Sequence, residues 1–309
     1  GTDVGCFFFS RIFSYFIEKL SEKIKMNILT VAFSLTWIFM PFLWYHKEKR
    51  DIENFKTEHS DRLGVRLIKN KTIFYNYYEF IDGFEQLREV KKIDSVPVDF
   101  SNIIKTDTNN SVSKIVVVIG ESARRQNMSL YGYERNTTPV AVNEKKNMFI
   151  FYNAVSPAPY THQAVPLTLS SIKFEDYAKR NYIGLNQNVV SIGKEFNYTP
   201  YWITHFYSPE ERLLGKGAKE IYTTSGYDDS NLLQPLDSLL KINEKQLIVI
   251  HFWGSHPDAK NNYPKSFEKF HGNNRLDEYD NSIAYTDYLL GEIIRKLRET
   301  NSAMISLYS

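Results

Sequence analysis

The sequence contains almost no cysteine and carries almost no net charge, and each absence excludes a class of protein. With Cys6 as its one cysteine, the chain cannot form an intramolecular disulfide or a zinc site built from cysteine thiolates. Its 38 basic and 36 acidic side chains leave a net charge of +2. A nucleic-acid-binding protein usually shows a clustered basic surplus, so the composition indicates no nucleic-acid partner.

Charged residues are also absent from one long segment, residues 27–45. At about 1.5 Å per residue, this run spans close to the hydrocarbon core of a bilayer, which is about 30 Å thick. It predicts a membrane helix at about residues 26–45, and Trp44 and Tyr45 are typical of the membrane interface. A buried helix of a soluble domain is the alternative. A cleaved signal peptide fits less well, because no small-residue cleavage site follows the run.

The first residues are interpreted as the end of a preceding membrane or interfacial helix. Residues 4–17 are apolar but short, and Arg11 interrupts them. Because the chain begins with Gly1, its true N-terminus is expected to be missing. Lysine and arginine nearly balance at the two ends of the predicted membrane helix, so charge leaves its orientation undecided.

Three parts are predicted along the chain. Residues 1–45 form the end of a transmembrane bundle, and residues 46–113 form a polar connecting region that ends in a linker rich in Asn, Thr and Ser. From residue 114 onward, short apolar runs alternate with helical or loop segments, which predicts an incomplete catalytic domain over residues 114–309.

The alternation of apolar runs and helical segments in residues 114–309 indicates an α/β fold around a largely parallel sheet with flanking helices. Buried strands are expected at residues 114–120, 148–155, 200–205, 246–253 and 303–308, and a helix at residues 279–300. In such sheets, functional sites lie beyond the carboxyl ends of the strands, so the residues after each run are the candidates for chemistry.

Several polar residues stand at these strand ends. Glu121 follows the first run; it suits a metal ligand or proton acceptor, or a glutamate in the first turn of a helix. Thr161, after a proline-rich loop, is either an ordinary helix N-cap or a metal-activated nucleophile that carries a covalent phosphoryl group. His251 and His256 follow the fourth run, and either is a candidate metal ligand or phosphate contact, or neither.

Four segments resemble known motifs. They are VVVIGESARRQNMSLYGYERNTTP at 116–139, SPAPYTHQAVPLTLS at 156–170, HFWGSHPDAKNNYP at 251–264 and YDNSIAYTDYLL at 279–290. They are similar to the opening motif, the nucleophile loop, the H-x-x-G-[SN]-H motif and the last helix before the final catalytic strand of bacterial phosphoethanolamine transferases. This family belongs to the alkaline phosphatase/sulfatase superfamily. The resemblance covers roughly residues 114–309, together with the membrane helix predicted before them.

The resemblance implies a membrane-helix bundle in the bacterial inner membrane and a sulfatase-like catalytic domain in the periplasm. It implies that Glu121 and Thr161 bind Zn²⁺, and that Thr161 takes phosphoethanolamine from phosphatidylethanolamine and passes it to lipid A, a core sugar or a glycan. His256 matches the family's histidine that contacts the substrate phosphate, and His205 lies where a polar substrate-binding residue often stands.

One departure from the family bears on activity. In the family, the strand similar to residues 303–309 runs into Asp-His-Gly-Glu, and a further histidine follows; these residues complete the zinc site. The sequence ends at Ser309. The chain is therefore expected to be a fragment truncated at both ends that binds zinc poorly, lacks activity and leaves one sheet edge uncovered. A sulfatase or phosphoglycerol transferase of the same superfamily, or a non-catalytic membrane-anchored remnant, are the alternatives.

Overall fold

The computed structural model describes residues 98–101, 103, 112–179, 181–205, 209–272, 274–300 and 302–308, and the isolated residues 31 and 88. The chain divides into two units, Gly1–Arg88 and Glu89–Ser309, and nearly every described residue belongs to the second. Within the described residues, no helix has both the length and the apolar character that crossing a membrane requires. The predicted membrane helix at residues 26–45 falls almost wholly outside them and stays a prediction, as does the boundary at residue 113.

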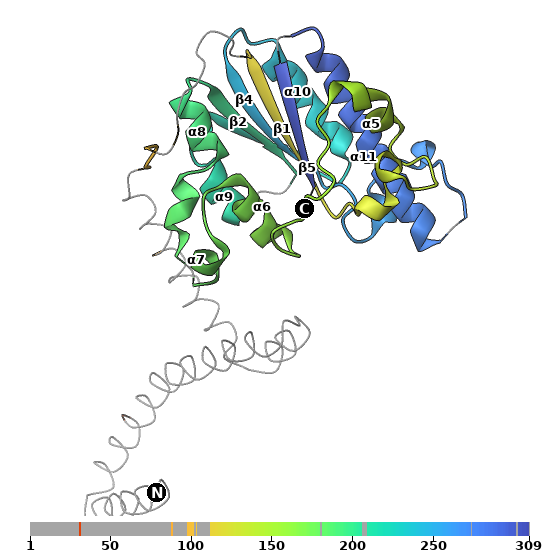
Figure 1. Cartoon of the computed structure of the whole chain (residues 1–309), viewed down its shortest axis with the longest axis horizontal. Helices are drawn as coiled ribbons and strands as arrows, with labels where there is room; N and C mark the ends of the chain where they lie inside the picture. The colour runs from red at the N-terminus through yellow and green to blue at the C-terminus, as the bar shows by residue number, and fades with distance from the viewer. Residues whose placement is uncertain are drawn as a thin grey trace, which may run out of the picture. The chain divides into compact units, whose positions relative to one another are not determined.

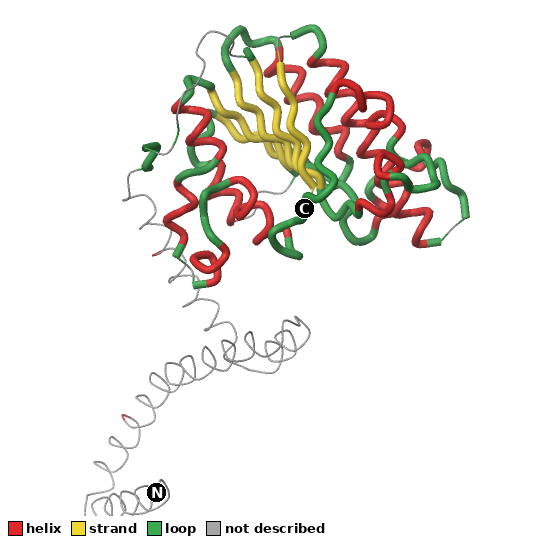
Figure 2. Tube along the Cα trace, in the orientation of Figure 1, coloured by secondary structure: helices red, strands yellow, loops and turns green. Residues whose placement is uncertain are grey.

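The described residues form a five-stranded sheet in the order β3-β2-β4-β1-β5, in which every neighbouring pair is parallel (Figure 2). The strands are β1 (Lys114–Gly120), β2 (Thr199–Thr204), β3 (Glu220–Thr223), β4 (Gln246–His251) and β5 (Ser302–Tyr308). Four of the five predicted strands are confirmed, and so is the predicted α/β class. The short, half-exposed β3 escaped prediction because it lacks a long apolar run.

The predicted strand at residues 148–155 is wrong. These residues form a loop in which Phe149 and Val155 are 96% and 88% exposed. Apolar, β-branched and aromatic residues favour a strand only when a neighbouring strand accepts their backbone hydrogen bonds. Both sides of β1 are already occupied, by β4 and by β5, and the loop pairs with no strand of the described part of the chain.

Helices cover both faces of the sheet (Figure 1). They are α5 (Pro139–Glu144), α6 (Thr161–Leu169), α7 (Phe174–Ala178), α8 (Val189–Glu195), α9 (Pro209–Gly215), α10 (Leu233–Leu240) and α11 (Arg275–Leu297). Successive residues of a strand point to opposite faces, so Val116 and Val118 pack with α10 and α11, whereas Val117 and Ile119 pack with α6, α8 and α9. Two apolar cores therefore hold β1 rigidly in the middle of the domain.

The helix predicted at residues 279–300 is confirmed as α11, although it begins earlier. The side chain of Asn274 accepts hydrogen bonds from the backbone N–H groups of Leu276 and Asp277, which caps the helix at this point. This added first turn brings Asp277 into the fold next to the segment that follows β1.

Asp287 of α11 is expected to make stability depend on pH. It is buried, and its two oxygens accept the N–H groups of Val140 and Ala141 at 2.7 and 3.0 Å, so it caps α5 from outside. Burial outweighs these hydrogen bonds and raises the pKa of Asp287 to about 6. The folded state therefore binds the proton more tightly than the unfolded state. The stabilisation is complete below the ordinary pKa near 4 and is lost as the pH rises through about 6.

Asp287→Asn cannot titrate, and it replaces one acceptor with a donor that faces a backbone N–H group. We expect it to be less stable than wild type by about 1–3 kcal/mol near pH 4, with a deficit that shrinks as the pH rises through about 6. Urea unfolding across this pH range measures the difference. Asp237→Asn, which changes a carboxylate 45% exposed on α10, is the matched control and should show a much smaller effect. A deficit that grows with pH would contradict the raised pKa.

Candidate active site at the carboxyl ends of the strands

The sheet brings the predicted residues to one edge. Glu121 directly follows β1, His251 is the last residue of β4, and His205 directly follows β2. Because the strands are parallel, their carboxyl ends meet at the same edge, where Thr161 begins α6. Glu121, Thr161 and His251 come into direct proximity, whereas His205 and His256 lie around the turn that follows β4.

Thr161 and Glu121 contact each other through their side chains. The hydroxyl of Thr161 donates a hydrogen bond of 2.5 Å to Oε1 of Glu121. Thr161 is the first residue of α6, and the N-cap is Tyr160, which makes no side-chain capping bond. The interpretation of Thr161 as an ordinary N-cap is therefore wrong, because its hydroxyl bonds to a carboxylate from another element.

Glu121 is likewise no helix N-terminal residue; the next helical turn begins at Arg125. Burial raises the pKa of Glu121, but the neighbouring His251 and Thr161 outweigh this effect and hold the pKa below its usual value. Ser122, which adopts the left-handed conformation at φ 54°, adds a hydrogen bond of 3.2 Å to Oε1. Glu121 is thus a buried anion whose oxygens face other polar groups at the strand end.

His251 bridges Glu121 and a second carboxylate, that of Glu211 on α9. Its Nδ1 atom lies 2.6 Å from Oε1 of Glu211, and its Nε2 atom lies 3.7 Å from Oε2 of Glu121. Burial lowers the pKa of His251, but the two carboxylates outweigh burial and raise it to about 9. Sequence reasoning missed Glu211, because a glutamate in a short helix carries no mark of burial.

The turn after β4 is fastened to Glu121. Oδ1 and Oδ2 of the buried Asp229 accept the backbone N–H groups of Trp253 and Gly254 at 2.7 and 2.9 Å. Gly254 has φ 59°, and a Cβ atom there would lie 2.9 Å from the carbonyl oxygen of Glu121, so only glycine fits. The N–H of Ser255 donates to the same oxygen at 3.0 Å. The turn therefore holds the backbone of Glu121 in place.

His256 and His205 both contact groups of this turn, His256 through Trp253 and His205 through Asp229. The ring of His256 packs on Trp253 with centroids 4.1 Å apart, and its buried Nδ1 makes no hydrogen bond within the described residues. The His205 side chain is 3% exposed; Nδ1 lies 2.7 Å from the hydroxyl of Thr224, and Nε2 lies 3.1 Å from Oδ1 of Asp229. His205 thus contacts Asp229, the residue that holds the turn. Substrate binding by the two histidines stays a prediction.

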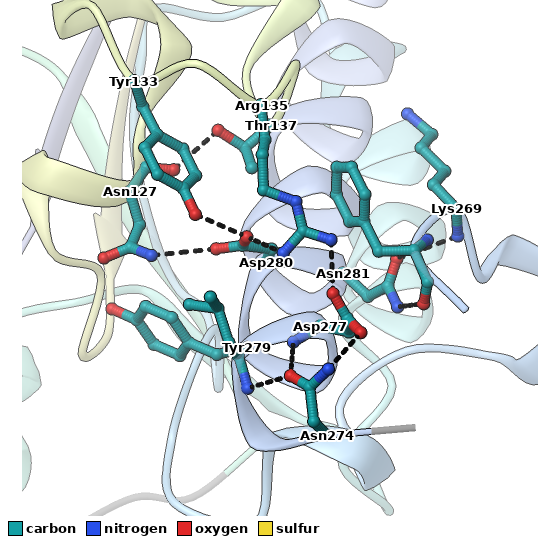
Figure 3. Close-up of polar contacts among 12 residues, drawn as sticks. Asn127, Tyr133, Arg135, Thr137, Lys269, Asn274, Asp277, Tyr279, Asp280 and Asn281 are labelled. Atoms are coloured by element: carbon teal, nitrogen blue, oxygen red, sulfur yellow. Dashed lines mark hydrogen bonds and ion pairs between the residues drawn. The ribbon is translucent and has the colours of Figure 1, made fainter. Parts of the chain in front are cut away.

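The segment between β1 and α5 is anchored to α11 by a buried polar cluster (Figure 3). Asp280, which is fully buried, accepts hydrogen bonds from Asn127 and Tyr133, each at 2.9 Å, and from Arg135 at 2.6 Å. Arg135 also pairs with Asp277. We refer to these five residues as the Asp280 cluster. Three residues of the motif at 116–139, Asn127, Tyr133 and Arg135, therefore have a structural role.

Tyr279 connects the same helix to the loop beside Glu121. Its hydroxyl accepts the N–H of Arg124 and donates to the carbonyl of Ser122, each over 2.7 Å. Since Ser122 is adjacent to Glu121 and bonds to its carboxylate, α11 holds the strand end in place through the side chain of Tyr279.

Within the described residues, no group of three or more His, Cys, Asp and Glu side chains is arranged to hold a metal ion. Glu121 and Thr161 nevertheless present two oxygens side by side, one of them anionic. Carboxylate oxygens are accepted zinc ligands, and a hydroxyl becomes one on losing its proton. The two residues therefore fit zinc as part of its ligand set.

Comparison with known proteins finds the sulfatase family over residues 113–306. The putative transferase YhbX of Escherichia coli is 29% identical over 96% of this chain and 54% of its own length. The phosphoethanolamine transferase EptA of Helicobacter pylori is 32% identical over 65% of this chain and 42% of its own length. The chain thus spans about half the length of the relatives that it matches. The crystal structure of the C-terminal periplasmic domain of EcEptC from E. coli, also solved in complex with Zn, is 27% identical. It superposes with a TM-score of 0.58 over 65% of this chain and 64% of that one.

Proposed function

The chain belongs to the sulfatase family and, within it, is similar to the phosphoethanolamine transferases. From this premise we propose that it transfers phosphoethanolamine from phosphatidylethanolamine to an acceptor of the bacterial cell envelope. The observation that carries the proposal is the hydrogen bond between the hydroxyl of Thr161 and the carboxylate of Glu121. It aligns a nucleophile with an anionic proton acceptor, as covalent phosphoryl transfer requires.

The proposed reaction has two steps. In the first, Oγ1 of Thr161 attacks the phosphorus of phosphatidylethanolamine; a new O–P bond forms, the bond to the diacylglycerol oxygen breaks, and diacylglycerol leaves with a proton. In the second, an acceptor hydroxyl attacks the phosphorus of the phosphoethanolamine-threonine, and Thr161 recovers its hydroxyl. Glu121 directs the proton of Thr161 away from the incoming phosphorus, because its Oε1 accepts that proton's hydrogen bond.

Other groups would stabilise the charged substrate. Thr161 is the first residue of α6, and the positive end of the helix dipole favours an anion there. His256, on the turn after β4, would contact the phosphate, and His205 is the further substrate-binding residue that the sequence predicts. Zinc, when bound through Glu121 and Thr161, would activate the hydroxyl and neutralise phosphate charge.

The proposal places the domain on the periplasmic side of the inner membrane, anchored by the predicted helix at residues 26–45. This location is supported by the similarity to a solved periplasmic domain. Lipid A, a core sugar and an envelope glycan are the proposed acceptors. That the 309-residue chain lacks activity stays a prediction, so activity is tested on the full-length protein.

The test supplies the purified full-length protein with fluorescent phosphatidylethanolamine in detergent micelles, with zinc or with a chelator. We expect zinc-dependent release of fluorescent diacylglycerol. Parallel assays with phosphatidylglycerol and an aryl sulfate address the phosphoglycerol transferase and sulfatase alternatives. If either compound is turned over faster than phosphatidylethanolamine, the proposed substrate is wrong and that compound takes its place. No turnover of any of them, in protein that binds zinc, would indicate a non-catalytic relative.

A further inference from the structure

His251 and Glu211 lie next to Glu121, and the reaction described above gives neither a role. The two nitrogen atoms of His251 face different carboxylates: Nδ1 is 2.6 Å from Glu211, and Nε2 is 3.7 Å from Oε2 of Glu121. The other oxygen of Glu121 accepts the hydrogen bond of Thr161. The four side chains thus form a continuous row, Glu211–His251–Glu121–Thr161, from α9 to the start of α6.

The burial of Glu211 is difficult to explain by packing. Its side chain is 4% exposed, and those of His251 and Glu121 are each 10% exposed. Leu214, one helical turn after Glu211 on α9, is fully buried, so both residues lie on the face that packs into the domain. An apolar residue at position 211 would fill such a place without the cost of removing a carboxylate from water. The position of Glu211 therefore indicates a role beyond packing.

Glu211 determines how the ring of His251 is oriented. Because Glu211 occupies Nδ1, the nitrogen that faces Glu121 is Nε2, which is buried and makes no hydrogen bond in the described part of the chain. The two oxygens of Glu121 consequently have separate neighbours: Oε2 faces His251, and Oε1 faces Thr161 and Ser122. Rotation of the carboxylate would break both arrangements at once.

We propose that Glu211 and His251 are positioning residues: Glu211 fixes the ring of His251, and this ring holds Glu121 with Oε1 toward Thr161. The inference rests on the proposed function, because it gives the row the task of orienting a zinc ligand beside the nucleophile. Groups that orient a metal ligand from behind typically change metal affinity or activity by about 10- to 100-fold when they are removed.

The experiment measures the zinc Kd of the full-length protein by competition with a chromophoric chelator, and the urea stability of its metal-free form. We expect Glu211→Leu to weaken zinc binding by about 10- to 100-fold. Its metal-free form should be less stable than wild type, because Nδ1 of the buried His251 loses its hydrogen-bond acceptor. Glu211→Gln keeps an acceptor for Nδ1–H and should recover most of the affinity. Glu292→Gln, which affects an exposed pair with Arg295, is the matched control and should bind zinc as wild type does.

Unchanged zinc affinity in Glu211→Leu would overturn the inference. So would a loss of affinity in both Glu211 variants that matches an equal loss of metal-free stability, because this pattern marks a merely structural residue. If Glu211→Leu does not fold, His251→Gln cuts the row at its next member and carries the same expectation. If Glu121→Ala instead binds zinc as tightly as wild type, the proposed zinc site itself is wrong. If zinc binding depends on Glu121 but not on Glu211, the positioning role of Glu211 is overturned and the proposed zinc site stands.

Discussion

Replacing Thr161 with alanine is expected to abolish phosphoethanolamine transfer by the full-length protein while leaving its fold intact. The substitution removes the only atom of this side chain that can form the covalent bond to phosphorus, so turnover should fall by roughly 10³-fold or more. The loss in stability should stay within about 2 kcal/mol, since one hydrogen bond to a charged group is lost. Diacylglycerol release and urea unfolding measure the two quantities.

Two further variants sharpen this test. Thr161→Ser keeps a hydroxyl at the same place and should retain part of the activity, together with the adduct in an intact-mass measurement. Thr168→Ala changes an exposed threonine of the same helix and should leave both activity and stability unchanged. Turnover retained by zinc-loaded Thr161→Ala would show that another group is the nucleophile.

The second large effect is expected in stability, from Asp280→Ala. The Asp280 carboxylate is fully buried and accepts hydrogen bonds from three side chains, of which Arg135 is charged. Its removal leaves the guanidinium with the Asp277 carboxylate and the ring of Phe270. It also takes away the acceptor that Asn127 and Tyr133 share. Breaking such a pair costs about 3–5 kcal/mol. Urea unfolding followed by tryptophan fluorescence and circular dichroism measures the change.

Glu278→Ala, two residues earlier on α11, is the matched control, because Glu278 is only half-buried and lies outside the Asp280 cluster. Asp280→Asn keeps the shape and one acceptor, and should lose less stability than the alanine variant. A change below about 1 kcal/mol for Asp280→Ala would mean that the cluster does not anchor the loop after β1.

The strands and the long helix could be predicted because their signals are local. Residues 114–120 and 246–251 are runs rich in β-branched residues, and both became central strands buried on both faces. Residues 148–155 carry a similar signal but form an exposed loop. A run of apolar residues predicts a strand without showing whether another strand lies beside it, so the sequence could not exclude this one.

The residues of the candidate site also fall into those that the sequence could predict and those that it could not. Glu121 and Thr161 could be selected because each follows a local signal: Glu121 follows the glycine that ends a strand, and Thr161 follows a proline-rich loop before a helix. Glu211 and Asp229 could not. Glu211 bonds to a histidine 40 residues away, and Asp229 bonds to backbone atoms of a turn more than 20 residues away.

The amino-acid order was sufficient for the α/β class, four of the strands, the family resemblance and the choice of Glu121 and Thr161 as site candidates. Hydrophobic periodicity and turn residues act over a few neighbours, so they can be read without the fold. The row from Glu211 to Thr161, the Asp280 cluster and the exposure of residues 148–155 depended on the folded chain. Burial, pairing and pKa values arise from groups that meet through the parallel sheet, and the sequence contains no distance between them.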